Sequence, residues 1–252
     1  MTLPKTPSFR LDGRRALVTG GSRGIGLGCA VALAEAGAHV VVAARGVGAL
    51  QASVDAMAAE GMSAEALPLD VTDRKAVGEA FEDKGPFDIL CNSAGIAKHG
   101  SAINTTEADF DAVIAVNIRA AYFLAQEAAR GMRGRGGSII QISSQMGHVG
   151  GIDRSVYCGT KHAVEGMTKA QAIEWGPEKI RVNTICPTFI RTPLTESTFQ
   201  DPERVAWIEG KIKLGRVGEI EDIMGAVVYL ASDASSLVTG TSILVDGGWT
   251  AG

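Results

Sequence analysis

The stretch Arg15-Ala-Leu-Val-Thr-Gly-Gly-Ser-Arg-Gly-Ile-Gly26 decides the fold of this chain. Its first part, through Thr19, is a short apolar run that predicts a buried strand. Its second part is a glycine-rich turn, and the apolar pattern that follows predicts a helix ending at Gly37. Glycines between a strand and a helix allow positive φ and let a phosphate group approach the N–H groups of the helix N-terminus. The turn alone is weak support for a nucleotide site, because any tight strand-to-helix turn favours glycine.

The same alternation of strand and helix continues to the end of the chain. Further strands are expected at 38–44, 64–69, 87–91, 138–142, 181–186 and 242–245, and further helices at 47–60, 74–81, 107–132 and 156–175, with a last helix around Ile223, Val227 and Leu230. Strands that alternate with helices imply right-handed crossovers and a parallel sheet. We therefore predict an α/β fold with a doubly wound, Rossmann-like, mostly parallel sheet and helices on both faces. Ligands of such a sheet bind at the carboxyl ends of its strands.

The segments outside this alternation define the expected domain organisation. Residues 1–10 are expected to form an N-terminal arm, and residues 11–252 one domain for both cofactor binding and catalysis. The segment 188–215 breaks the rhythm of strands and helices and is expected to contribute to the substrate site. A chain of 252 residues suits a single core of this kind.

Composition excludes several other classes. Apolar residues make up 46% and there are 32 glycines, which suits a parallel sheet with tight turns. The net charge of −4 argues against a nucleic-acid partner. No apolar run approaches membrane length and no signal peptide begins the chain, so we expect no membrane partner and a cytoplasmic location. No metal site is expected, because the cysteines lie far from one another and from the histidines in sequence, at Cys29, Cys91, Cys158 and Cys186.

A second informative stretch runs from Ser144 to Lys161. Tyr157 and Lys161 are four residues apart, so on a helix their side chains share one face. An ammonium beside a phenol stabilises the phenolate and suits the tyrosine to proton transfer. An isolated pair with this spacing would favour an ordinary exposed pair instead, but other motifs accompany this one.

Taken together, these motifs resemble the short-chain dehydrogenase/reductase family, and the resemblance covers nearly the whole chain. The matching pieces are Thr19-Gly-Gly-Ser-Arg-Gly-Ile-Gly26, Asp70, Asn92-Ser-Ala-Gly95, Asn117, Ser144, Tyr157-x-x-x-Lys161 and Pro187 to Thr192. The resemblance implies an NAD(P)-dependent oxidoreductase that transfers a hydride between its cofactor and a carbonyl or secondary alcohol. It also implies four catalytic residues. Tyr157 would be the acid/base, Ser144 would bind the substrate oxygen, Lys161 would assist the tyrosine and bind the nicotinamide ribose, and Asn117 would hold a water molecule.

The resemblance also implies the cofactor site. Asp70 would meet the adenine, Asn92 and Gly95 the adenosine ribose, and Ile190 and Thr192 the nicotinamide. The full expected set is Gly20, Ser22, Arg23, Gly24, Ile25, Gly26, Arg45, Asp70, Asn92, Ala94, Gly95, Tyr157, Lys161, Pro187, Ile190 and Thr192. The chain departs from the family pattern at Thr188, where a glycine is usual, so the backbone expected after Pro187 is open to question.

Cofactor choice can be argued from charge at the end of the second strand. An acidic residue there would bind a free 2′-hydroxyl and repel a 2′-phosphate. This chain has Arg45 at that place and a second cation, Arg23, in the glycine turn. Two guanidinium groups without a carboxylate favour NADP(H), with NAD(H) left open.

The substrate is the least determined part of the prediction. Residues expected at the pocket mouth are mostly polar, which favours a small polar substrate such as a sugar, a polyol or a hydroxy or keto acid. Among them, Gln145, His148, Arg154 and Thr188 are predicted to bind it, and His99 comes from the loop after the fourth strand.

The sequence leaves two alternative functions open and also predicts an oligomeric state. A 3-oxoacyl-(acyl carrier protein) reductase would need exposed positive charge, for which Arg130, Arg133 and Arg135 are candidates. A dinucleotide-binding sensor without turnover is the alternative from another class. The family resemblance further implies a homotetramer, with helices 107–132 and 154–175 at an interface.

Overall fold

The computed structural model describes residues 1–193 and 195–252. Their centre is a seven-stranded sheet in the order β3-β2-β1-β4-β5-β6-β7, with every neighbouring pair parallel. The strands are β1 (Arg15–Thr19), β2 (His39–Ala44), β3 (Ala64–Pro68), β4 (Ile89–Asn92), β5 (Gly137–Ile142), β6 (Ile180–Pro187) and β7 (Ser242–Val245). The strand order reverses direction beside β1, so the chain winds outward in both directions. This confirms the predicted doubly wound parallel sheet.

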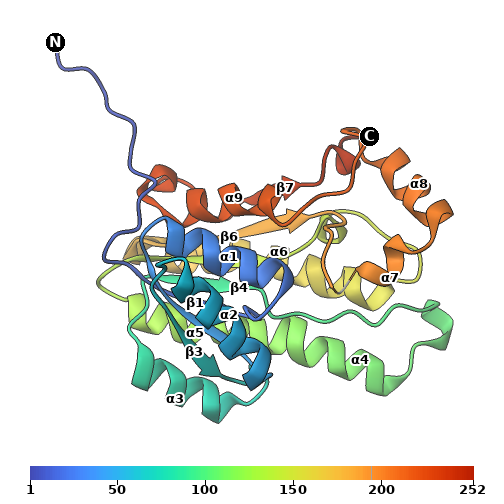
Figure 1. Cartoon of the computed structure of the whole chain (residues 1–252), viewed down its shortest axis with the longest axis horizontal. Coiled ribbons are helices and arrows are strands. Elements are labelled where there is room, and N and C mark those ends of the chain that lie inside the picture. The colour runs from blue at the N-terminus through green and yellow to red at the C-terminus, as the bar shows by residue number, and fades with distance from the viewer. Residues whose placement is uncertain (194) are drawn as a thin grey trace.

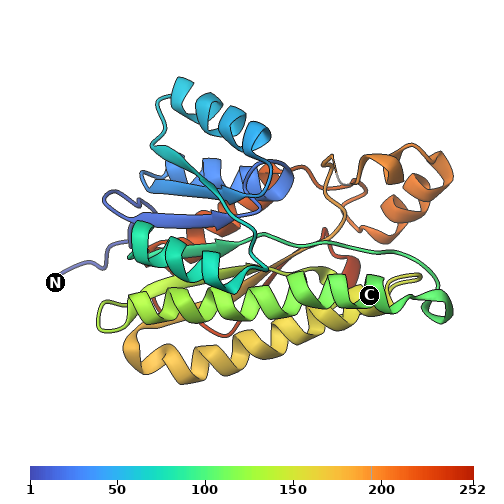
Figure 2. The same ribbon diagram turned by 90° about the horizontal axis from the view of Figure 1, so that it is seen from below.

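Helices cover both faces of the sheet (Figures 1 and 2). One face carries α1 (Gly24–Glu35), α2 (Val47–Ala59) and α9 (Glu221–Ala231), and the other carries α3 (Arg74–Lys84), α4 (Glu107–Ile114), α5 (Ala121–Met132) and α6 (Ser155–Trp175). Two short helices, α7 (Glu196–Phe199) and α8 (Pro202–Lys211), occupy the segment that breaks the alternation. Short 3-10 turns complete the chain at η1 (Ala102–Asn104), η3 (Gln145–Gly147), η4 (Gly176–Glu178), η5 (Asp233–Ser235) and η6 (Trp249–Ala251).

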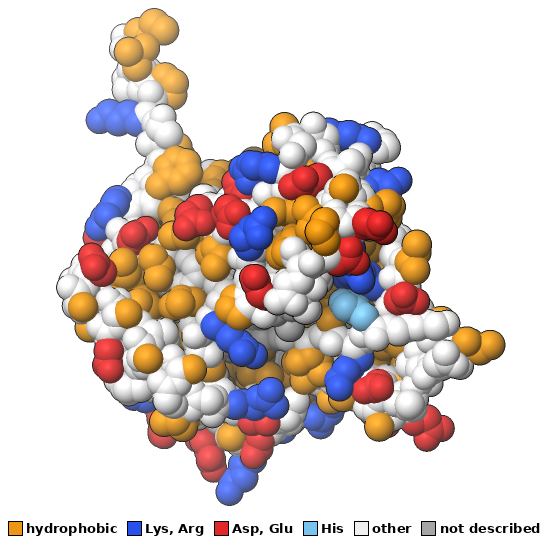
Figure 3. Space-filling model, turned by 45° about the vertical axis from the view of Figure 1, so that its right-hand side comes forward, with side chains coloured by type: hydrophobic (Ala, Val, Ile, Leu, Met, Phe, Trp, Pro, Cys, Tyr) orange, Lys and Arg blue, Asp and Glu red, His pale blue; other side chains and the backbone are white. Residues whose placement is uncertain are grey.

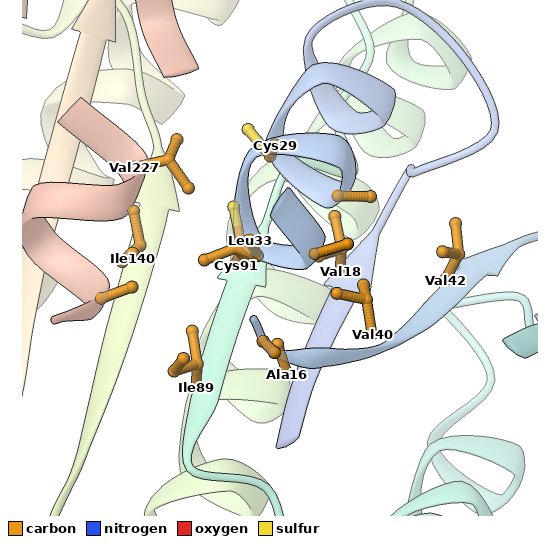
Figure 4. Close-up of a cluster of buried hydrophobic side chains, with 14 of the residues drawn as sticks. Ala16, Val18, Cys29, Leu33, Val40, Val42, Ile89, Cys91, Ile140 and Val227 are labelled. Carbon is orange, nitrogen blue, oxygen red and sulfur yellow. The ribbon is translucent and has the colours of Figure 1, made fainter. Parts of the chain in front are cut away.

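The core forms because each inner strand is apolar on both sides. In β1, Ala16 and Val18 pack under α1, while Leu17 faces α5 on the other side. Figure 4 shows the first of these layers, where Cys29 and Leu33 of α1 lie over β1 and β4. Residues of alternating strand positions thus divide between the two faces, as a buried parallel sheet requires. Among the described residues, no helix combines the length and apolar character that a membrane crossing requires.

The largest local difference from the predicted elements lies within residues 107–132. A single helix was expected there, but a π-helical turn, η2 (Ala115–Ala120), separates α4 from α5. A π-turn admits one extra residue per turn and changes the direction of nearby side chains. At the N-terminus, residues 1–10 form no helix or strand; the first of them extend away from the sheet (Figure 1), whereas Phe9 lies against Tyr229 of α9.

Candidate active site

The glycine turn after β1 is shaped by close backbone approaches. Gly20 has a φ of +67°, and a Cβ placed on it would lie 3.0 Å from the backbone of Ala94. A Cβ on Gly26 would lie 2.2 Å from the carbonyl oxygen of Gly20. Only glycine fits at these two points. Helix α1 begins at Gly24 without a side-chain cap from Arg23 and without an acidic residue in its first turn, so its first N–H groups remain available to an anionic ligand.

A row of polar side chains crosses the sheet next to this turn. Thr19 donates a 2.6 Å hydrogen bond to Asn92, whose amide donates a 2.8 Å bond to Gln141. These three residues occupy matching register positions in β1, β4 and β5. The Asn92 side chain therefore joins the ends of three strands, and the Thr19 hydroxyl, which also accepts a 3.3 Å hydrogen bond from the Ala94 N–H, holds the loop after β4 beside Gly20. In the sequence, this row of hydrogen bonds is indicated only by a polar residue near the end of each of three apolar strands.

Asp70 and Arg45 lie at the carboxyl edge of β2 and β3. One oxygen of Asp70 accepts hydrogen bonds from the backbone N–H and the hydroxyl of Thr72, at 2.9 and 2.7 Å. These bonds, with a smaller contribution from Arg45, lower the pKa of the Asp70 carboxyl. Its second oxygen accepts no hydrogen bond from the described residues. Arg23 and Arg45 are exposed and form no ion pair within the described part of the chain.

Tyr157 and Lys161 lie on one face of α6, as their spacing predicts. The Lys161 ammonium lies 5.6 Å from the centre of the Tyr157 ring. The lysine is 7% exposed, and its one hydrogen bond among the described residues goes to the carbonyl of Ile142, at 2.9 Å. An ammonium has three donors, so two remain for a ligand and the phenol. A Cβ on Gly95 would lie 3.9 Å from the same ammonium, so the loop after β4 also borders it.

Asn117 reaches the same edge of the sheet because it lies in the π-turn η2. Its amide oxygen accepts a 2.9 Å hydrogen bond from the Ile96 N–H, and its amide nitrogen donates 2.9 Å to the Ile96 carbonyl. The same nitrogen lies 3.2 Å from the Thr160 hydroxyl. Asn117 therefore joins the loop after β4 to the helix that carries Tyr157 and Lys161.

Ser144 ends the loop after β5 and lies near the segment after β6. Its hydroxyl accepts a 3.1 Å hydrogen bond from the Met146 N–H and lies 3.5 Å from the carbonyl oxygen of Pro187. Thr188 follows with its N–H bound to Val245, and its φ is not in the left-handed region. The backbone there thus accommodates a threonine in place of the usual glycine. Ile190 is buried, and the Thr192 side chain lies beside Gly24, which brings this segment to the glycine turn.

Two of the predicted substrate residues carry polar groups without partners. The Gln145 side chain is 1% exposed, and both atoms of its amide lack a hydrogen bond to any described residue. The hydroxyl of Thr188 is buried and equally without a partner there. Buried polar groups are costly unless they are hydrogen-bonded, so both are available to a polar ligand or to water.

The third predicted substrate residue, His148, belongs to a cluster behind Ser144. Its Nε2 lies 3.4 Å from Cys186 Sγ and 3.7 Å from Glu165 Oε2. The Glu165 carboxylate accepts hydrogen bonds from Cys186, Thr184 and Ser242, and the last two extend the polar row across β6 and β7. A role for His148 in binding substrate stays a prediction.

The same cluster brings together three residue types that can bind metal ions. The ligand atoms of His148, Glu165 and Cys186 all lie within 4.8 Å of one another. Burial, followed by Glu165, raises the pKa of the Cys186 thiol to about 12, so the sulfur keeps its proton at neutral pH. Metal ions bind the thiolate, and here the thiol proton serves the Glu165 carboxylate. The cluster is thus a satisfied hydrogen-bond network, and the expected lack of a metal site stays a prediction.

The fourth predicted substrate residue, Arg154, lies at the N-terminus of α6. Its guanidinium stacks on the Phe189 ring at 5.0 Å. The His99 ring meets the Tyr157 ring edge-on at 6.0 Å. Burial, with smaller contributions from Arg154 and Arg204, lowers the pKa of His99 to about 4. Arg204 was missed by the sequence analysis, because no motif surrounds it and only folding brings α8 to this place.

The chain resembles known proteins over nearly its whole length. A family described as enoyl-(acyl carrier protein) reductase matches residues 20–250. An L-xylulose reductase of Bos taurus is 40% identical over 96% of this chain and 99% of its own length. The chain belongs to the short-chain dehydrogenase/reductase family.

Other short-chain dehydrogenase/reductase proteins match as fully. The gluconate 5-dehydrogenase of Gluconobacter oxydans is 39% identical over 96% of both chains. Among solved structures, a gluconate 5-dehydrogenase from Burkholderia cenocepacia in complex with NADP and tartrate superposes with a TM-score of 0.92. It is 35% identical and covers 97% of this chain and 98% of its own. The similarity therefore extends over both the glycine turn and the Tyr157 region.

Proposed function

We propose that this protein is an NADP(H)-dependent oxidoreductase that interconverts a carbonyl and a secondary alcohol on a small polar substrate of the sugar, polyol or hydroxy-acid class. The observation that carries the proposal is the buried ammonium of Lys161 beside the Tyr157 ring, at the carboxyl edge of the sheet. Asn117 and Ser144 border the same edge. Helix α6 and the loops after β4, β5 and β6 contribute these groups, so the fold itself brings them together.

The dinucleotide fits the other half of this edge. Gly20 and Gly26 leave a cradle that a Cβ would fill, and the first N–H groups of α1 are uncapped. These would hold the pyrophosphate. The free oxygen of Asp70 would meet the adenine, and Arg23 with Arg45 would bind a 2′-phosphate. The NADP in the related Burkholderia cenocepacia structure supports this choice.

The residues of this chain divide the proton chemistry among them. NADP(H), when bound, supplies or accepts the hydride. In the direction of reduction, Tyr157 donates its phenolic proton to the carbonyl oxygen, and the Ser144 hydroxyl donates a hydrogen bond to the same oxygen. The Lys161 ammonium stabilises the phenolate that results, because it is buried beside the ring and held by the Ile142 carbonyl. Asn117 fixes the loop and helix between which the lysine lies.

A polar substrate is supported by the groups around Ser144. The amide of Gln145 and the hydroxyl of Thr188 are buried without partners among the described residues, and sugar or polyol hydroxyls would satisfy both. The names of related proteins, L-xylulose reductase and gluconate 5-dehydrogenase, point to the same class of substrate.

The 3-oxoacyl-(acyl carrier protein) reductase alternative stays second. It would require free positive charge near the active-site rim. Each of the three arginines considered for that role is paired with a carboxylate: Arg130 with Glu127, Arg133 with Glu178 and Arg135 with Asp88. Paired arginines offer an acidic carrier protein less attraction than free ones.

A homotetramer in the cytoplasm completes the proposal. Helices α4, α5 and α6 form the outer layer on one side of the sheet (Figure 2). Their outward side chains include Phe110, Tyr122 and Ile173, which are 47%, 38% and 79% exposed. Exposed apolar side chains along one outer layer favour contact with a second copy of the chain.

Replacement of Tyr157 with Phe tests the proposed function. The variant removes the proton that the reaction needs, so turnover of a sugar or polyol should fall by about 10²- to 10⁴-fold. Binding of NADPH, followed by its fluorescence, should change little. Tyr229→Phe is the matched control, because Tyr229 lies on α9 against Phe9. Unchanged turnover in Tyr157→Phe would contradict the proposed role of Tyr157. Binding of NADPH by the wild-type protein without turnover of any substrate would instead support the non-catalytic sensor.

A further inference from the structure

His99 and Arg154 lie beside Tyr157, and Arg204 lies near both of them; the three residues come from three separate elements. Arg154 is the residue just before α6, Arg204 lies on α8, and His99 belongs to the loop after β4. The His99 ring contacts the Tyr157 ring. Arg154 acts electrostatically on both His99 and Tyr157, and Arg204 acts on both His99 and Arg154. In Figure 3, a histidine and several basic side chains lie around a hollow on this face of the molecule.

Neither guanidinium pairs with a carboxylate of the described residues. In the described part of the chain, Arg154 and Arg204 take part in no ion pair, whereas Arg191 and Arg216 nearby are paired with Glu219 and Asp222. Asp153 is the carboxylate that acts on Arg154, and its effect is smaller than that of burial and of Arg204. A partly buried cation beside a second cation is unfavourable in the free protein. An anionic ligand would relieve both costs.

The Arg154 side chain is also held in place for such a ligand. Its guanidinium stacks on Phe189, whose ring packs on Trp249 at 5.8 Å. Trp249 packs in turn on Trp207 of α8 at 5.6 Å. Helix α8, which carries Arg204, therefore packs through Trp207 and Trp249 on the Phe189 ring that lies under Arg154. A guanidinium fixed in this way offers two parallel donors, the geometry that a carboxylate accepts.

We propose that Arg154 and Arg204 bind the carboxylate of the substrate, so that the preferred substrate is a sugar acid, an aldonate or ketoaldonate, rather than a neutral sugar or polyol. This inference rests on the proposed oxidoreductase function and specifies its substrate class. With the carboxylate at Arg154, the carbon that reacts lies at Tyr157, one helical turn away. Gln145 and Thr188 then bind hydroxyls of the same chain of carbons.

Matched pairs of substrates test this proposal. D-gluconate and D-glucitol differ by a carboxylate in place of a hydroxymethyl group, and both are assayed with NADP+ alongside other aldonates and their alditols. The wild-type protein should prefer the aldonates. Arg154→Met keeps an unbranched side chain of similar length without the charge, and it should lower kcat/KM for aldonates by about 10- to 100-fold, the value of a hydrogen bond to a charged group. For alditols, kcat/KM should fall by less than about 3-fold. Arg154→Lys should recover part of the kcat/KM for aldonates.

An inhibition measurement distinguishes loss of a carboxylate-binding site from a general loss of structure in the variants. Malonate should inhibit aldonate oxidation competitively, and its inhibition constant should rise in Arg154→Met and in Arg204→Met. Arg133→Met is the control, because the Arg133 side chain is 72% exposed and pairs with Glu178 of η4, beyond the C-terminal end of α6. Equal losses on aldonates and alditols, or none on either, would overturn the carboxylate site. A preference of the wild-type protein for alditols would also overturn the carboxylate site, but the proposed oxidoreductase function would stand. If no substrate of the panel were turned over with NADP(H), the oxidoreductase function itself would be contradicted.

Discussion

Arg45 is the residue on which cofactor choice depends most directly. It stands at the end of β2, exposed and without an ion pair among the described residues. A phosphate on the adenosine ribose would gain a charge-assisted hydrogen bond from it, worth about 1.5–3 kcal/mol. Arg45→Asp removes that bond and adds repulsion. We expect KM for NADPH to rise by about 10- to 100-fold and KM for NADH to fall, as measured in parallel kinetic titrations.

The control for this prediction is Arg14→Asp, an exposed arginine at the amino end of the same sheet, which pairs with Asp233. It should leave both constants unchanged. Equal KM values for NADPH and NADH in the wild-type protein would contradict the charge argument.

His99 predicts a specific pH response. Its pKa is lowered from the ordinary 6.5 to about 4, mainly by burial. Between these values the unfolded chain binds more protons at this residue than the folded protein. His99 therefore has no effect on the free energy of unfolding above about pH 6.5. It lowers that free energy as the pH falls from 6.5 toward 4. We expect its NMR titration midpoint at about 4, and a higher midpoint in Arg154→Met, since one repelling cation is gone.

His99→Gln supplies the complementary measurement. Because His99 is exposed, solvent screening limits its contribution to the free energy of unfolding to about 1 kcal/mol or less. The variant should lose less stability than the wild type when the pH is lowered from 7 to 5 in urea unfolding. A wild-type midpoint near 6.5 would show that the His99 ring is not buried against its cationic neighbours in solution.

At the scale of the element, the turn between β1 and α1 depends on glycine at particular points. A Cβ on Gly26 would lie 2.2 Å from the Gly20 carbonyl oxygen, so Gly26→Ala must displace the turn. Overpacking of this kind costs about 1–3 kcal/mol. We expect a lower free energy of unfolding and weaker NADPH binding, measured by urea unfolding and fluorescence titration.

Gly78→Ala is the matched substitution in a helix interior. Gly78 lies in α3 with open space around its Cβ position. Alanine there should raise the free energy of unfolding by about 0.5–1 kcal/mol and leave NADPH binding unchanged. If Gly26→Ala behaved like Gly78→Ala, the close approach at Gly20 would not constrain the turn.

Helices and strands with a clear apolar period were predictable, whereas the π-turn was not. Residues 107–132 read as one helix because helical and π-helical turns leave nearly the same apolar pattern in the sequence. What selects the π-turn is tertiary: Asn117 gains two hydrogen bonds to the backbone of Ile96, a residue of another loop. A local pattern holds no information about that partner.

At the scale of the whole molecule, the sequence predicted the layers and the edge of the sheet where the site lies. Parallel strands separated by helices permit few arrangements, and their carboxyl ends must share an edge. The sequence did not predict the contacts around the predicted substrate-binding residues Arg154 and His148. Arg204, Glu165 and Cys186 lie far apart in sequence, carry no common motif, and meet Arg154 or His148 only through folding.

Assembly is the last property that the surface predicts. Tyr122 and Ile173 expose apolar side chains on the outer layer of α5 and α6, and a shallow groove between these helices is lined by Tyr122, Gln126 and Trp175. A charge at Ile173 would be desolvated in an interface there, with its symmetry mates nearby. We expect the wild-type protein to have the mass of four chains by light scattering and Ile173→Glu to have a smaller mass. Ala52→Glu, on the exposed side of α2 beyond the opposite face of the sheet, should keep four. If Ile173→Glu also kept four, α5 and α6 would not form the interface.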